Sequence, residues 1–183
     1  QLFSSKHWAY SLGMKTSDGD NNNHKLHKSC VAIELSNVGP LELKADGKTL
    51  RRAKLKSTDP NIDYCTLDMI EAYVKLESPF RGFIYYASYP EAQMKSLAIL
   101  VKWLSARFNI PLEVLEESVR YNWDIPSQTF SGITSHINYR QTGKWDIGPE
   151  VFDWARFKKD IQPVTATATR GGQKSKKVEI EID

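Results

Sequence analysis

The chain has 183 residues, of which 40% are hydrophobic and 26% are charged, a composition typical of one globular domain with a sizeable core. Its net charge of +3 at pH 7 is too small an excess for the basic surface of a nucleic-acid-binding protein. No apolar run approaches the roughly 20 residues that cross a bilayer, and the first residues contain no signal-peptide core. We therefore expect neither a nucleic-acid partner nor a membrane span.

The N-terminal part of the chain begins with an apolar pair and then becomes polar. Leu2 and Phe3 indicate the end of a strand, and because a domain rarely starts inside its hydrophobic pattern, we expect N-terminal strands to be missing. Residues 16–23 (TSDGDNNN) are turn formers and predict a loop. Residues 30–35 (CVAIEL) are apolar and β-branched, which predicts a short buried strand that contains Glu34.

The two cysteines, Cys30 and Cys65, are far apart in the sequence and form no Cys-x-x-Cys motif. This spacing argues against a disulfide scaffold and against a cysteine-based zinc finger, although one disulfide between them remains open. We expect two buried thiols instead, because free cysteine is among the most buried residue types.

The middle of the chain predicts hairpins followed by one long helix. Residues 41–86 form short alternating stretches with turn signals, and Asp46-Gly47 among them predicts a β-hairpin. The next segment has the clearest helical pattern of the chain. Apolar residues recur there at intervals of three and four, which predicts an amphipathic core helix over residues 91–108.

The C-terminal third predicts two shorter helical pieces and a tail. A second helix is expected over residues 112–119 and a last helical turn over 152–157. After Pro163 the sequence TATATRGGQKSKK has no large apolar residue and cannot bury a core. We therefore divide the chain into one domain, 1–162, and a flexible tail or linker, 163–183. The last six residues alternate with period two and could add an edge strand or join another domain.

Four residues are candidates for chemistry: Glu34, His136, Lys144 and Asp146. A carboxylate inside an apolar strand is expensive unless it is paired or serves a metal-bound water. Each candidate also has an ordinary interpretation, as an edge-strand carboxylate, a surface histidine or a solvated turn pair. Spacing alone favours the ordinary interpretations.

The order of the motifs adds a second argument. Lys144 follows His136 by eight residues and Asp146 follows it by ten, ahead of IGP at 147–149 and FDWARF at 152–157. This arrangement resembles the type 2 zinc N-acetylmuramoyl-L-alanine amidases, which in turn resemble the peptidoglycan-recognition proteins.

Two further motifs support the resemblance. Residues 30–35 look like the glutamate-bearing strand of the family, and YPEAQ at 89–93 looks like the start of its central helix. The resemblance covers about residues 2–157, with 41–86 as a longer, hairpin-rich insertion. It implies an α/β fold in which a mixed central β-sheet is flanked by α-helices and the N-terminal strands are missing.

The resemblance also implies a reaction. His136 and Asp146 match two ligands of a Zn²⁺ cofactor, Glu34 matches the general base that takes a proton from the zinc-bound water, and Lys144 matches the cation that stabilises the oxyanion. The implied enzyme hydrolyses the amide bond between N-acetylmuramic acid and L-alanine in peptidoglycan or a muropeptide, as a cell-wall-degrading endolysin does. Such a hydrolase would work in a periplasmic, extracellular or phage-associated setting.

The sequence departs from the family in two respects, and these departures favour a second, non-enzymatic function. The family's first zinc ligand, a strand histidine, would have to come from a missing N-terminal segment, and the activity of the chain alone depends on it. Ser11 stands where the family has a site-lining histidine. His7, His24 and His27 match no motif and are interpreted as loop histidines. The alternative is a catalytically inactive peptidoglycan-binding relative or a structural component of a phage or secretion particle.

Overall fold

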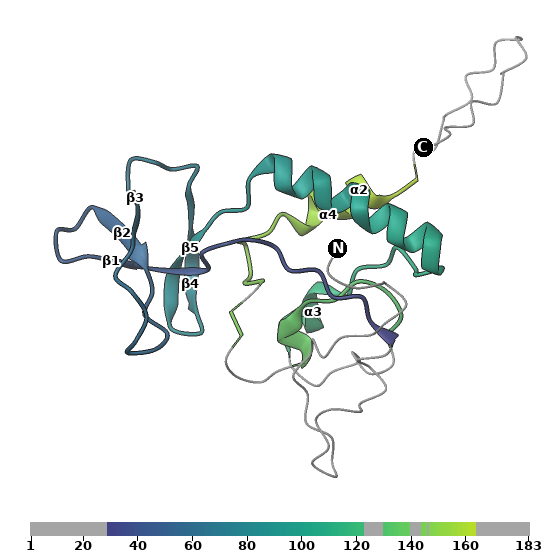
Figure 1. Cartoon of the computed structure of the whole chain (residues 1–183), viewed down its shortest axis with the longest axis horizontal. Coiled ribbons are helices and arrows are strands. Elements are labelled where there is room, and N and C mark those ends of the chain that lie inside the picture. The colour runs from purple at the N-terminus through teal and green to yellow at the C-terminus, as the bar shows by residue number, and fades with distance from the viewer. Residues whose placement is uncertain (1–28, 123–129, 140–143, 146, 164–183) are drawn as a thin grey trace, which may run out of the picture.

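The computed structural model describes residues 29–122, 130–139, 144–145 and 147–163, and these form an α/β structure. The strands are β1 (Pro40–Leu43), β2 (Thr49–Arg52), β3 (Asp63–Thr66), β4 (Tyr73–Phe80) and β5 (Phe83–Ala87). The helices are α2 (Glu91–Phe108), α3 (Glu117–Arg120), the 3₁₀ helix η1 (His136–Tyr139) and α4 (Trp154–Ile161). Figure 1 shows the sheet at one end of the molecule and α2 beside α4 at the other.

The sheet has the strand order β3-β2-β1-β5-β4, and all its neighbouring strands are antiparallel. β1 and β2 form the hairpin predicted at Asp46-Gly47, which is confirmed: Gly47 has a positive φ of 70° in the turn. The Asp46 carboxylate accepts the backbone N–H groups of Lys48 and Thr49 at 3.0 and 2.9 Å. These hydrogen bonds lower the pKa of Asp46 to about 2.

The observed sheet differs from the predicted one in its strands and their direction. It is built from the segment predicted as an insertion, and its pairs are antiparallel rather than mixed. The strand predicted over residues 30–35 is wrong, because this segment is extended but unpaired, with Val31 52% and Ile33 36% exposed. A short apolar run fits a buried strand only if a neighbouring strand is present, which the run itself does not reveal. Leu2 and Phe3 lie outside the described residues.

The long helix predicted over residues 91–108 is confirmed by α2. Its buried face, which includes Leu97 and Val101, packs against Phe157 and Ile161 of α4 in the largest core cluster. At the N-terminal end of α2, the Glu91 carboxylate accepts a hydrogen bond from the Arg156 guanidinium at 2.8 Å, which ties the two helices together. The hydrogen bonds from Arg156 and Lys95 lower the pKa of Glu91 to about 2.

The two shorter helical predictions have different outcomes. The helix predicted over residues 112–119 is confined to α3, because Val114 instead forms a parallel β-bridge with Ile133. The helical turn predicted over 152–157 is present but begins later, since Asp153 caps α4 by accepting the backbone N–H of Arg156 at 2.9 Å. Within the part of the chain that the structure describes, no helix is both long and apolar enough to cross a membrane.

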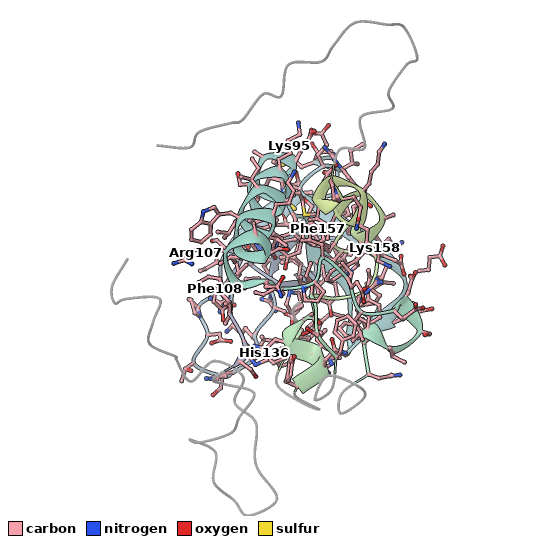
Figure 2. All side chains as sticks on the ribbon, turned by 90° about the vertical axis from the view of Figure 1, so that its right-hand side faces the viewer. Lys95, Arg107, Phe108, His136, Phe157 and Lys158 are labelled. Carbon is pink, nitrogen blue, oxygen red and sulfur yellow. The ribbon has the colours of Figure 1, made fainter. Side chains whose placement is uncertain are left out.

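The core between α2 and α4 supports a prediction about stability. Phe157 is 2% exposed and its ring lies 5.4 Å from that of Phe152, centroid to centroid. Figure 2 shows Phe157 inside the molecule and Phe108 at the outer end of α2. We expect Phe157→Ala to lower the free energy of unfolding by about 3–5 kcal/mol, because it leaves a cavity in this core. Urea denaturation measures the loss.

The matched control is Phe108→Ala, because Phe108 is the same residue type but is 43% exposed. It is expected to lose only about 1 kcal/mol. Equal losses in the two variants would mean that α2 and α4 do not form the stabilising core.

Candidate functional site

A cavity of about 750 Å³ lies beside the C-terminal half of α2. Its wall is formed by α2 and by residues from the stretches 29–40, 130–139, 144–145 and 147–152. A volume of roughly 300–1,000 Å³ is typical of small-molecule sites. Aromatic rings from β5 and α4, such as Tyr86 and Trp154, contribute to the lining. The cavity is therefore of ligand size, and its wall contains both apolar and polar groups.

Three of the four predicted site residues line this cavity: Glu34, His136 and Lys144. They come from the extended segment before β1, from η1 and from the stretch before α4. The structure thus places in one cavity wall side chains that are up to 110 positions apart in the sequence. Asp146, the fourth, lies outside the described residues, as do Ser11 and the histidines at positions 7, 24 and 27.

Glu34 is exposed, which contradicts its predicted place in a buried strand but agrees with the ordinary interpretation of a solvent-facing carboxylate. Its exposure removes the desolvation cost that a position inside a buried strand would impose. The chain just after it is fixed in place, because the Gln93 side chain donates to the Ser36 carbonyl at 3.0 Å and the Asn37 amide donates to the Ser88 carbonyl at 3.0 Å. Glu34 therefore projects from a segment that α2 and the end of β5 hold.

His136 is half-buried at the start of η1, and Figure 2 shows it at the lower edge of the described structure, below Phe108. The next two residues, Ile137 and Asn138, are fully buried. The Asn138 amide donates to the carbonyls of Val119 and Asn122 at 3.2 and 2.9 Å. These bonds fasten η1 to α3, which fixes the backbone that carries His136.

Cys30 and Tyr139 add a thiol and a phenol to the cavity lining. Burial raises the pKa of the Cys30 thiol, although its hydrogen bond with Tyr139 opposes the shift, and burial also raises the pKa of Tyr139. Both groups are therefore uncharged at neutral pH, which disfavours Cys30 as a thiolate nucleophile. Cys30 and Cys65 are both free, so the open disulfide is not formed, and only Cys65 has the predicted full burial.

Tyr86 of the cavity wall was not predicted as a site residue, because no local pattern connects β5 with the candidate residues. The pKa of Tyr86 is raised to about 12 by burial, and its hydroxyl donates to the Phe80 carbonyl at 2.6 Å. Tyr86 therefore remains a neutral hydrogen-bonded group at all physiological pH values.

The donor types of the predicted zinc site fit the metal, since imidazole and carboxylate both bind Zn²⁺. In residues 29–122, 130–139, 144–145 and 147–163, no three His, Cys, Asp or Glu side chains gather closely enough to hold a metal ion. Asp146 is not among those residues, so the zinc site stays a prediction.

Comparison with known proteins adds no further assignment: the chain matches no family model, no curated protein and no solved structure. The family resemblance therefore depends on the order of the sequence motifs. The cavity is an observation independent of that order.

Proposed function

We propose that the chain is a zinc-dependent N-acetylmuramoyl-L-alanine amidase that acts on peptidoglycan. The observation that carries the proposal is the shared cavity of Glu34, His136 and Lys144, three residues to which the resemblance assigns parts of one reaction. The type 2 amidase fold is also part of the proposal, because the described residues show an α/β structure and no more specific fold. A cavity of about 750 Å³ has room for a muramoyl-peptide segment around the scissile amide.

Each residue has a separate part in the proposed hydrolysis. His136 and Asp146 would hold Zn²⁺, which would supply Lewis-acid activation of a water and of the substrate carbonyl. Glu34 accepts a proton from the attacking water and returns it to the leaving amine of L-alanine. The Lys144 ammonium lies near the carbonyl oxygen and stabilises the negative charge that develops there. The products are a free stem peptide and a glycan chain without it.

A second candidate function is binding of peptidoglycan in the same cavity without hydrolysis. Ser11 favours it, because a serine stands where the family has a site-lining histidine. The two functions differ in whether peptide is released, and one experiment separates them.

The experiment incubates the chain with purified peptidoglycan sacculi and measures soluble peptides by mass spectrometry. The amidase proposal expects stem peptides with a free N-terminal L-alanine when Zn²⁺ is in excess, released slowly because His136 and Asp146 are only two ligands, and none after chelation with EDTA. Co-sedimentation with the sacculi but no released peptide would favour the binding function. Neither release nor co-sedimentation would contradict both.

A further inference from the structure

We infer that the β4–β5 hairpin is part of the functional site, because Arg81 in its turn positions the segment that carries Lys144. The chemical role of Lys144 rests on the proposed function, whereas the contact between the hairpin and this segment does not. Most of this hairpin lies within residues 41–86, the stretch interpreted from the sequence as an insertion, and this stretch thereby gains a functional role.

The turn between β4 and β5 contains a residue type that is unusual at its position. Arg81 and Gly82 join β4 to β5 and have positive φ values of 48° and 89°. Such two-residue turns match the twist of the flanking strands, and asparagine, aspartate or glycine usually occupies them. Arginine is uncommon in this backbone region, which draws attention to the contacts of its side chain.

Two hydrogen bonds run in opposite directions between this turn and residues 144–145. The Arg81 guanidinium donates to the backbone carbonyl of Lys144, 63 positions away in the sequence. The indole N–H of Trp145 donates to the backbone carbonyl of Arg81 at 3.4 Å. The guanidinium also lies over the Phe80 ring, 5.5 Å from its centroid, which restricts its rotation. Each partner thus holds the other through backbone atoms.

Packing strengthens this connection on both sides of position 146. Trp145 packs against the buried cluster that includes Leu76 and Tyr86 of the hairpin strands. Beyond it, Gly148 lies so close to Phe80 that an added Cβ would be 3.3 Å from the ring. The hairpin therefore contacts this chain segment before and after the predicted ligand position.

These contacts fix the backbone of Lys144 and so limit the positions that its side chain can take. Its backbone carbonyl is fixed by Arg81, and the side chain is half-buried in the cavity wall. A cation that stabilises a developing charge must be placed before the reaction, and small displacements of such groups reduce rates strongly. Arg81 is therefore a positioning residue: it acts on the reaction through Lys144 and does not touch the substrate.

The test compares Arg81→Ala and Arg81→Lys with the matched control Arg107→Ala. Arg107 makes the same kind of aromatic contact, 5.7 Å from the Phe108 ring, at the end of α2. The first readout is the two-dimensional NMR signal of the Trp145 indole N–H, assigned through Trp145→Phe. The second is the kinetics of muropeptide hydrolysis, as kcat and KM separately.

We expect Arg81→Ala to shift the Trp145 indole signal and to lower kcat about 10- to 100-fold with little change in KM. Arg81→Lys should recover part of kcat, because an ammonium can still donate to the Lys144 carbonyl but lacks the planar fork. Arg107→Ala should change neither readout. An unshifted indole signal in both Arg81 variants, or a kcat equal to that of the unmodified chain, would overturn the inference.

The two proposals can fail separately. If the unmodified chain hydrolyses nothing while the indole signal shifts in the Arg81 variants and not in Arg107→Ala, the amidase proposal fails and the positioning contact stands. If Arg81→Ala does not fold, Arg81→Lys still decides, because it keeps the charge at the turn.

Discussion

Glu34→Gln is expected to abolish turnover in the active protein while zinc binding stays nearly intact. Glutamine has the shape of glutamate but cannot take a proton from the attacking water, and general-base catalysis contributes about 10²- to 10⁴-fold to the rate. Glu34 is exposed at the cavity, so the substitution leaves no buried polar group without a partner. The loss of activity should therefore occur without a loss of stability.

Release of dye from labelled peptidoglycan, measured alongside zinc content and the thermal unfolding midpoint, tests this expectation. Glu71→Gln is a matched control, because Glu71 is also an exposed glutamate but does not line the cavity. Retention of most activity in Glu34→Gln would remove this residue from the mechanism. Loss of zinc along with activity would instead make Glu34 a ligand.

The parts of the fold that could be predicted are those specified by local patterns. The helix over 91–108 follows from one apolar residue on every turn, and α2 buries that face against α4. The hairpin at Asp46-Gly47 follows from a glycine where the backbone needs a positive φ. In both cases the residues that form the structure are neighbours in the sequence.

The parts that could not be predicted depend on distant partners. Residues 30–35 have the composition of a strand, but strand pairing needs a neighbour, and the extended segment contributes to the cavity wall instead. Residues 112–116 lose the predicted helix for the same reason, because Ile133 pairs with Val114. Local propensity is a weak guide where a tertiary contact competes with it.

The candidate site also has residues that the sequence predicts and residues that only the structure reveals. The order of motifs indicated Glu34, His136 and Lys144, and all three line one cavity. Arg81 could not be found from the sequence, because its link to Lys144 joins residues 63 positions apart and ends on a backbone carbonyl. Sequence motifs indicate groups that carry chemistry, whereas the groups that hold them are visible only in the structure.

A large loss of zinc binding is expected when the predicted zinc ligand His136 is replaced. A catalytic zinc normally has three protein ligands, and His136 with Asp146 supplies two. We therefore expect the chain to retain less than stoichiometric zinc after dialysis, and His136→Ala to lower the remaining zinc affinity by at least about tenfold, with a matching loss of hydrolysis. The fold should survive, because buried Ile137 and Asn138, not His136, fasten η1 to α3.

Zinc content after equilibrium dialysis measures the effect, and Glu34→Gln, which should keep its zinc, is the control. Zinc content unchanged by His136→Ala would contradict the assignment of His136 as a ligand. Stoichiometric zinc that His136→Ala removes would mean instead that this chain contains the third ligand. Alanine variants of His7, His24 and His27 would then identify it, because the true ligand is the one whose loss equals that of His136 and leaves a two-donor site too weak to hold the metal.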